Sequence, residues 1–445
     1  MEEEAGNFRS YLFWIVATSV VAIVGVVGLV IIVDPYGLYG LASPRVGFNA
    51  IKPRLTRYQD EIKLTHAIAL KPEILILGNS RAEIGFDPEG LALSSRGVSA
   101  YNLAIPGIGI AVSRRQLDHL HRKGINPKQL ILGLEFLDFI DDLGRPTSVL
   151  ARVDSIGKHP IDKRFWRFDC LFSLMSLKDA LTTLIIQREK EPETMTSRGF
   201  NPLLQYQALV RNEGYYALFN QKAKEYAKLY LRKASGSRSS TDFAHLRAIL
   251  ELAAQSGIDI KLFVYPYHSQ VLSLFESAGL WPIFEDWKKQ VTREVSALRH
   301  RYPAANVKFF DFSGYSFYNC ERIPGKGDRI TETRWYWEGG HFKKELGELV
   351  LERILSDSEN QFIKRSESRF GRELVQSTEL ANQRRIADER TTCLTAYPEL
   401  FEESAELVAT MRALGHAKLI RAGDVESSRE LVPLHTNPSP FSSRR

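Results

Sequence analysis

The chain has 445 residues, enough for one large domain or two ordinary ones, and 44% of them are hydrophobic, as is typical of a globular protein. Its 59 Lys and Arg residues are scattered among 53 Asp and Glu residues, which leaves a formal net charge of only +6. This balance gives no support for nucleic-acid binding, so we expect no nucleic-acid partner.

An apolar segment follows a short leader at residues 1–10. Residues 11–33 carry no charge, and as a helix they would extend about 34 Å, enough to cross a hydrocarbon core of about 30 Å. We therefore predict a transmembrane anchor at residues 11–33. A cleavable signal peptide is the alternative, but the run is longer than a usual signal core and no small-x-small site closes it.

The orientation of the anchor is less clear from the sequence. Three basic residues follow it within residues 45–54, and a literal positive-inside count would keep the body in the cytoplasm. Long domains, however, translocate largely regardless of charge. Cys170, Cys320 and Cys393 do not decide the question, because they are few, odd in number and without metal-ligand spacing. They predict neither a disulfide framework nor a zinc site.

The body begins with a juxtamembrane connector at residues 34–70 and continues as an α/β domain at residues 71–356. Short apolar runs alternate there with helical spacers, which is the pattern of a doubly wound parallel sheet. The alternation lapses at about residues 141–240, which we predict to be a helical insertion. Residues 357–445 are a polar, partly helical tail with a disordered end. The five predicted strands are 74–77, 98–103, 130–136, 258–265 and 307–312.

The first predicted strand ends at Gly78-Asn79-Ser80. Ligands bind at the carboxyl ends of strands in open α/β sheets, so a serine delivered there is a candidate nucleophile. The alternative is that Asn79 and Ser80 only form a turn and cap the next helix, which both residue types do well.

A serine nucleophile needs a base, and the base works best when a third group orients its imidazole. His341 follows the last strand, and Glu338 precedes it by three residues, a spacing that can bring the carboxylate to the imidazole. A tetrahedral intermediate also needs N–H donors, and we expect them from the backbone of Ser80 and of Gly107, in a glycine-bearing loop. The part played by Asn102, just before that loop, is open.

These motifs resemble the SGNH (GDSL-like) hydrolase family, particularly its membrane-anchored bacterial branch. Block I of the family is Gly-Asp-Ser and stands here as Gly78-Asn79-Ser80; block II is kept by Asn102 and Gly107; block V stands as Glu338-Gly339-Gly340-His341, with Glu for Asp. The resemblance covers about residues 70–356. It implies a flavodoxin-like three-layer fold with a five-stranded parallel sheet, Ser80 as nucleophile, His341 as base and Gly107 in the oxyanion hole.

The chain departs from the family at block III. The family has Gly-x-Asn-Asp, whose Asn is an oxyanion donor, whereas residues 133–138 read Gly-Leu-Glu-Phe-Leu-Asp. An ionised carboxylate cannot donate to an oxyanion, so Glu135 or Asp138 would have another role. Branches of the family that transfer acetyl groups to bacterial exopolysaccharides also vary around this block. Acetyl transfer therefore remains an alternative to ester hydrolysis.

Further residues are candidate substrate contacts: Asn79, Arg81, Asn102, Glu135 and His268. Arg81 either contacts an acidic substrate or pairs with Glu83, and His268 lies on the functional edge or is only a surface residue. The aromatic residues 335–337 either stack on a sugar or, as we favour, pack the loop that holds His341.

The apolar segment and the resemblance to the membrane-anchored bacterial branch together imply a single-pass protein of a bacterial inner membrane, and we expect its body to lie outside the cytoplasm. We expect a serine esterase or O-acetyltransferase that acts on an acylated small molecule or, better, an acylated cell-envelope polysaccharide, without a metal or organic cofactor. The alternative is a non-catalytic polysaccharide-binding or scaffold protein of envelope assembly. Protein partners cannot be named from the sequence.

Overall fold

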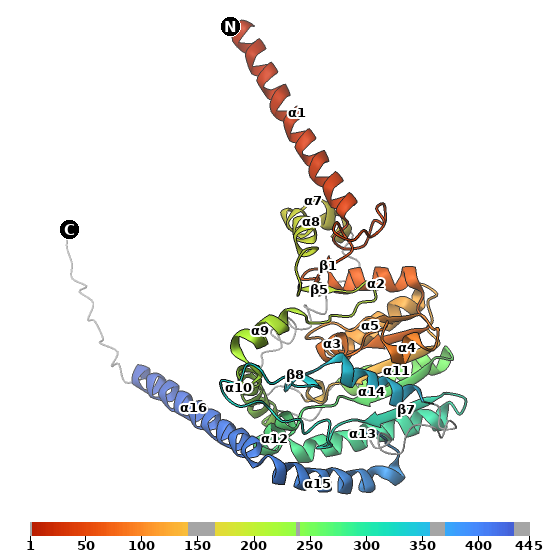
Figure 1. The fold of residues 1–445 in the computed structure, drawn as a ribbon, viewed down its shortest axis with the longest axis vertical. Helices are drawn as coiled ribbons and strands as arrows, with labels where there is room; N and C mark the ends of the chain where they lie inside the picture. The colour runs from red at the N-terminus through yellow and green to blue at the C-terminus, as the bar shows by residue number, and fades with distance from the viewer. Residues whose placement is uncertain (1, 141–164, 237–240, 357–369, 431–445) are drawn as a thin grey trace, which may run out of the picture.

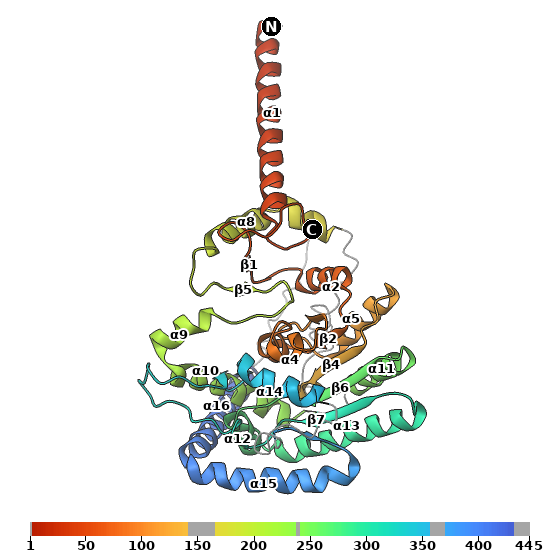
Figure 2. The ribbon, with the colours of Figure 1, turned by 45° about the vertical axis from the view of Figure 1, so that its right-hand side comes forward.

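The computed structural model describes residues 2–140, 165–236, 241–356 and 370–430. It is a mixed α/β protein with a sheet of mostly parallel strands and one apolar N-terminal helix (Figures 1 and 2). The first part of the predicted insertion, residues 141–164, and the predicted disordered end, residues 433–445, lie outside the described residues.

Helix α1 (Glu2–Val33) projects away from the body, and its segment Ser10–Val33 is long and apolar enough to cross a membrane, as an anchor or as a signal sequence (Figure 1). The helix ends where Lys52 Nζ donates to the carbonyls of Val33 (3.2 Å) and Asp34 (2.6 Å). The Asp34 carboxylate accepts backbone N–H groups of residues 38–40. These bonds satisfy helix-end and turn groups that would otherwise lack partners.

The main sheet has six strands in the order β10-β7-β6-β4-β2-β3. Five of them run parallel and overlap the five predicted strands; their runs of Ile, Leu, Val and Phe are buried because helices cover the sheet. Strand β10 pairs antiparallel with β7 and was not predicted. The strands are β2 (Ile74–Leu77), β3 (Ala100–Asn102), β4 (Gln129–Leu134), β6 (Asp259–Val264), β7 (Val307–Asp311) and β10 (Arg372–Glu373).

Helices lie on both sides of this sheet, with α3, α4 and α14 packed together and α5, α11 and α13 packed together (Figure 2). The connector contributes α2. The helices of the domain are α2 (Gln59–Leu70), α3 (Ser80–Gly85), α4 (Leu91–Ser94), α5 (Ile110–Arg122), η1 (Phe136–Phe139), α11 (Asp242–Gln255), α12 (Ser269–Ala278), α13 (Trp281–Arg301) and α14 (Lys344–Leu355).

The described part of the insertion is mainly helical. It also contains a short strand, β5 (Thr194–Met195), which pairs with β1 (Lys52–Pro53) of the connector and was not predicted. A second small sheet, β8 (Tyr336–Glu338) with β9 (His341–Phe342), follows β7. The helices of the insertion are α7 (Trp166–Phe172), α8 (Leu174–Ile186), α9 (Gln205–Glu213) and α10 (Tyr215–Ala234).

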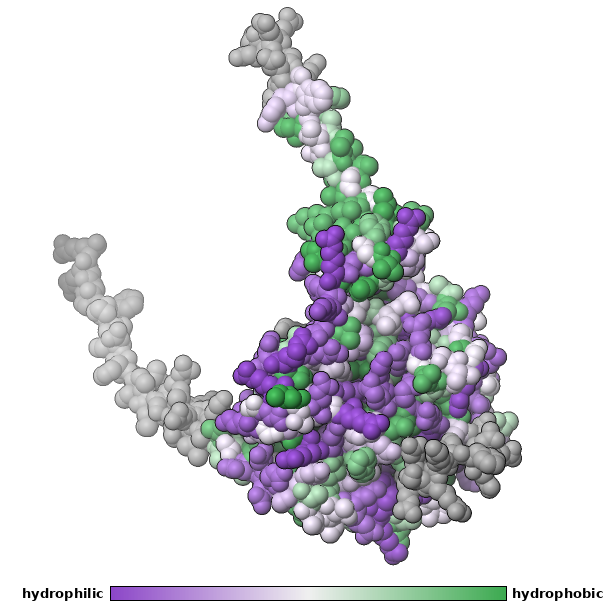
Figure 3. Space-filling view, in the orientation of Figure 1, coloured by the Kyte–Doolittle hydropathy of each residue, from purple (hydrophilic) through white to green (hydrophobic). Residues whose placement is uncertain are grey.

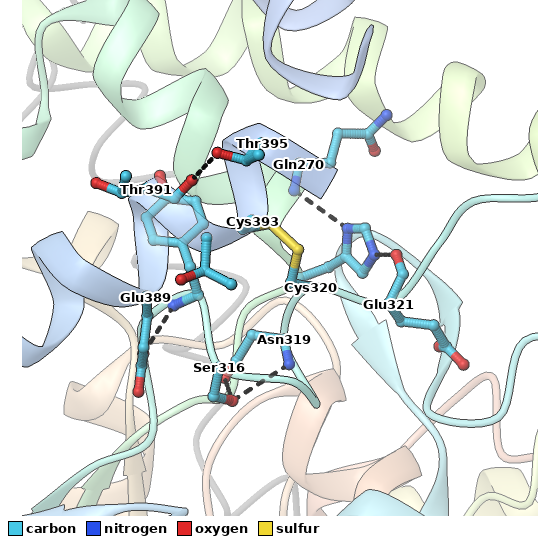
Figure 4. The surroundings of a disulfide bond; sticks show 12 residues. Gln270, Ser316, Asn319, Cys320, Glu321, Glu389, Thr391, Cys393 and Thr395 are labelled. Carbon is cyan, nitrogen blue, oxygen red and sulfur yellow. Dashed lines mark hydrogen bonds between the residues drawn. A yellow bond between two sulfur atoms is a disulfide. The ribbon is translucent and has the colours of Figure 1, made fainter. Parts of the chain in front are cut away.

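The C-terminal segment packs against the body through η2 (Gln376–Thr378), α15 (Glu379–Ala396) and α16 (Pro398–Glu430). Helix α16 lies against α10 and α12, where Phe401 and Val408 are buried. A disulfide joins Cys320 to Cys393 of α15 (Figure 4). The number and spacing of the cysteines had not indicated this disulfide. The two cysteines are 73 positions apart on separate elements, and only the fold brings their Cα atoms to 6.0 Å.

Candidate active site

Ser80 lies at the carboxyl end of β2 as the first residue of α3, and it is partly exposed. Asn79 caps this helix, because its Oδ1 accepts the backbone N–H of Arg81 at 3.0 Å. The turn at Gly78 has a φ of +149°, and a Cβ there would collide with the Tyr265 hydroxyl. A glycine is therefore required just before the Asn-Ser pair. The capping role predicted as the alternative is real for Asn79, and it leaves the Ser80 side chain available.

The Ser80 hydroxyl meets His341, although the two residues are 261 positions apart. His341 Nε2 lies 2.9 Å from Ser80 Oγ, and His341 Nδ1 is hydrogen bonded to Glu338 Oε1. The other oxygen of Glu338 accepts the backbone N–H of Gly340 at 2.7 Å. The fold thus joins all three side chains predicted as catalytic in one hydrogen-bonded line.

Glu338 is only 1% exposed. Burial acts to raise the pKa of its carboxyl, but the attraction of His341, the hydrogen bond to that imidazole and the Gly340 N–H together hold the pKa below its usual range. A carboxylate at this position can fix the imidazole with its proton on Nδ1 and leave Nε2 free to accept the proton of Ser80.

The two glycines between Glu338 and His341 are needed for space. A Cβ on Gly340 would collide with the hydroxyl of Tyr226 in α10, and one on Gly339 would lie 3.0 Å from Gln270 Oε1 in α12. The β8–β9 hairpin is therefore packed closely against α10 of the insertion and against α12 of the domain. Tyr226 thus packs against the loop that holds His341.

The predicted oxyanion donors are both backbone groups. Gly107 is exposed in the loop after β3 with a φ of +72°, a conformation that favours glycine. Within the described residues we find no hydrogen-bond acceptor for the N–H of Ser80 or of Gly107. Neither N–H is therefore committed to an acceptor within the described residues.

Asn102 has a structural role instead of a contact with substrate. It is fully buried, its Nδ2 donates to the carbonyls of Ala82 and Phe86 at 2.8 Å each, and its Oδ1 accepts the N–H of Ala104. These bonds tie the helix that carries Ser80 to the end of β3. The expectation of substrate contact at this residue is inconsistent with its burial.

Glu135 organises a second polar cluster beside the nucleophile. Its carboxylate pairs with Arg81 and accepts hydrogen bonds from Asn79 Nδ2 (3.2 Å) and the Tyr267 hydroxyl (3.0 Å). The Arg81 guanidinium also lies 5.1 Å from the centre of the Tyr267 ring, a cation–π distance. Glu135, Asn79 and Arg81 are thus together at the edge of the sheet, and all three are mostly buried.

The alternative pairing of Arg81 with Glu83 is wrong. Glu83 instead binds Lys63 of α2 at 2.8 Å, with both side chains at most 1% exposed. Asp138 lies near Glu135, and burial together with the charge of Glu135 raises the pKa of the Asp138 carboxyl.

His268 is not a surface residue and is not open to a substrate. It is fully buried; its Nδ1 accepts the N–H of Gln270 at 3.1 Å, and its Nε2 donates to the Glu321 carbonyl at 2.8 Å. Burial lowers its pKa to about 4, so the ring is neutral and caps α12. Trp335 and Trp337 are likewise buried, in agreement with the packing role that we favoured.

An open cavity of about 610 Å³ lies beside the β8–β9 hairpin, between α10, α16 and the loop at residues 322–326. Phe219 and Gln270 line it, and both also lie near Gly339. Its wall mixes aromatic, acidic and basic side chains, which suits a polar ligand better than an apolar one. The charged residues that line it are Arg322, Lys326, Glu399, Glu403 and Glu406.

Comparison with known proteins finds no matching family, curated relative or solved structure. In the part of the chain that the structure describes, no group of three His, Cys, Asp or Glu side chains could hold a metal ion.

The sequence reasoning missed Tyr226, Tyr265 and Tyr267. The last two follow β6 at the carboxyl edge of the sheet, so their position alone could have drawn attention to them.

Proposed function

We propose that the chain is a membrane-anchored serine esterase or O-acyltransferase that resembles the SGNH hydrolases. The observation that carries this proposal is the hydrogen-bonded line from Ser80 through His341 to the buried Glu338. Such a line is what a serine needs to become a nucleophile at neutral pH, and it forms here from segments at opposite ends of the domain.

In the proposed reaction, Ser80 Oγ attacks the acyl carbon of an ester while His341 Nε2 accepts the hydroxyl proton. Glu338 stabilises the imidazolium that forms, and the N–H groups of Ser80 and Gly107 hold the oxyanion. His341 then gives the proton to the leaving alcohol. Water or a sugar hydroxyl next attacks the acyl-serine, which completes hydrolysis or transfer respectively.

The order of the parallel strands supports the flavodoxin-like assignment. In chain order the five strands are β2, β3, β4, β6 and β7, and in space they follow the order 2-1-3-4-5 of doubly wound folds of that kind. The switch point of this order lies between β2 and β4, and Ser80 and Glu135 follow these two strands.

The disulfide supports a body outside the cytoplasm, because structural disulfides form and persist in oxidising compartments. An anchored enzyme on that side of a bacterial inner membrane would meet cell-envelope polysaccharides. We therefore favour an O-acetylated envelope polysaccharide as the substrate, with Arg81 and Asn79 beside the acyl site.

The test is the Ser80→Ala variant of the full-length protein with p-nitrophenyl acetate. Turnover should be lost while the thermal unfolding curve is kept. Ser256→Ala is the matched control, since Ser256 follows α11 and precedes β6, at the opposite edge of the sheet. Retained turnover in Ser80→Ala would refute the assignment.

Glu135 favours a second candidate, a non-catalytic member of the same fold that binds polysaccharide or scaffolds an envelope assembly. It occupies the position of the family's oxyanion Asn and is engaged by Arg81, Asn79 and Tyr267. A serine-reactive fluorophosphonate separates the two candidates. The enzyme should be labelled at Ser80 and lose the label in His341→Gln, whereas a scaffold would not be labelled.

A further inference from the structure

Helix α8 differs from a helix on the surface of a water-soluble body because it exposes large apolar side chains. Its buried positions are Ser176, Ala180, Thr183 and Ile186. On its outward side, Leu174 is 85% exposed and Ile185 is 63% exposed. Soluble proteins bury such side chains and rarely expose them together.

Helix α7 continues the same surface. Phe168 and Phe172 are exposed one helical turn apart, and their rings stack with centroids 4.2 Å apart. We call this surface the α7–α8 apolar face. It consists of Phe165, Phe168, Phe172, Leu174, Met175, Leu181 and Ile185, all of them exposed.

The α7–α8 apolar face adjoins the candidate membrane span. Val30 and Val33 of α1 pack on Ala180 of α8, and an apolar groove of about 250 Å³ separates Ala22–Val27 from the α7–α8 junction. Ala22 precedes the end of the span by eleven residues, about 16 Å along the helix axis. Figure 3 shows hydrophobic surface continuing from α1 onto the adjoining end of the body.

We propose that α7 and α8 insert into the bilayer leaflet from which α1 emerges, with the α7–α8 apolar face in contact with lipid. The proposal rests on α1 being a retained membrane anchor. Half of a hydrocarbon core is about 15 Å thick, so the junction beside Ala22 would reach well into that leaflet. Lys178 lies in the same stripe as Leu174, Leu181 and Ile185, and its long side chain can extend to the headgroups.

The insertion would fix the body on the membrane, because α7 and α8 are tied to the connector by partly buried hydrogen bonds. The Tyr36 hydroxyl donates to Asp179, and the Tyr58 hydroxyl donates to Asp169, each at 2.6 Å. The β1–β5 pairing adds a backbone link. The catalytic domain would then stand at a set height and orientation above the lipid instead of moving on a flexible tether.

Spin labels on the full-length chain test this inference in bilayers of phosphatidylethanolamine and phosphatidylglycerol. Labels are attached at Leu181→Cys and Ile185→Cys in a Cys170→Ala background, since the other two cysteines form the disulfide. Val24→Cys in α1 is the lipid control. Ile330→Cys, 91% exposed in a distant loop, is the water control. Collision with oxygen reports lipid, and collision with a water-soluble nickel chelate reports water.

Labels at positions 181 and 185 should match the one at position 24, with an oxygen-to-nickel ratio several-fold above that at position 330. Nickel access as high as at position 330, with position 24 in lipid, would overturn the proposal. Low collision with both reagents, together with dipolar broadening, would show a second copy on this face and would also overturn it. Nickel access at position 24 would refute the anchor itself. None of these readouts depends on esterase activity, so failure of the proposed function would be seen separately.

Discussion

Replacing Glu338 by Gln tests the orienting carboxylate without changing its shape. In the native protein both carboxylate oxygens accept hydrogen bonds, one from His341 Nδ1 and one from the N–H of Gly340 at 2.7 Å. A glutamine amide has one accepting oxygen and one donating NH₂ group. The variant can therefore satisfy only one of these two partners in the native way.

Each orientation of the glutamine amide in the Glu338→Gln variant has a predictable cost. If the oxygen keeps Gly340, the NH₂ faces Nδ1 and forces the imidazole proton onto Nε2, which then donates to Ser80 across 2.9 Å and cannot accept its proton. The equivalent change in a Ser-His-Asp enzyme lowers kcat about 10⁴-fold, or roughly 5.5 kcal/mol. If the oxygen keeps His341, two donors face each other at Gly340, which costs about 1–3 kcal/mol. The imidazole therefore keeps its proton on Nδ1 only at the cost of this donor–donor contact.

We therefore expect Glu338→Gln to lower kcat for p-nitrophenyl acetate by about 10- to 10⁴-fold with KM little changed, the smaller loss applying if the amide oxygen keeps His341 and the larger if it keeps Gly340. Glu348→Gln is the matched control, because Glu348 also accepts a backbone N–H, that of Ala92, but on α14 away from the hairpin. Turnover of Glu338→Gln within tenfold of the native protein, while Ser80→Ala is inactive, would refute the orienting role.

Three further predictions follow from the contacts around the site. Gly340→Ala should lower turnover at least about tenfold, because its Cβ collides with Tyr226 and a 1 Å misplacement alone can cost about 100-fold; Gly325→Ala, with open space around it, should not. Lys63→Met leaves the charge of Glu83 buried and unpaired, so denaturant unfolding should show a loss of about 3–5 kcal/mol, and a loss below about 1 kcal/mol would contradict the pairing. Stability should fall as the pH drops below about 4. Burial acts to raise the pKa of the Asp311 carboxyl, but the charge of Lys288 outweighs it, so the pKa is lowered. The pKa of Glu338 is lowered in the same way by His341. The unfolded chain then takes up protons that these folded carboxyls resist, so unfolding midpoints that stay constant from pH 5 to pH 2 would contradict this assignment.

The parallel strands could be predicted because each is a short apolar run bounded by turn residues. The carboxyl-edge rule then indicated that Ser80 and the hairpin of His341 should lie on the same side, and the structure brings them together. Strand β10 could not be predicted, because two residues are too few to show the alternation of apolar and polar side chains that marks a strand. Its pairing also depends on β7.

The contacts that the sequence did not indicate join side chains far apart in the chain. Glu135 has Arg81 and Tyr267 as partners, 54 and 132 positions away, and no local spacing encodes such a set. The same holds for the disulfide. His268 shows the opposite error, since its place after a strand suggested a functional edge while its two hydrogen bonds and burial give it a structural role.

The substitution at block III changes the expected rate more than it changes the expected chemistry. Glu135 cannot donate to an oxyanion while ionised, so one donor of the resembling family is absent, which costs on the order of 100-fold, about 3 kcal/mol. The N–H groups of Ser80 and Gly107 do not depend on Glu135. A buried carboxylate on the imidazole is itself costly to maintain unless its charge is used or fully compensated; Glu338 has two donors, the Gly340 N–H and His341, and His341 also reaches Ser80. A scaffold would have no need of the contact between His341 and Ser80. The arrangement therefore favours a slow acyl-transfer enzyme over a protein that has lost its chemistry.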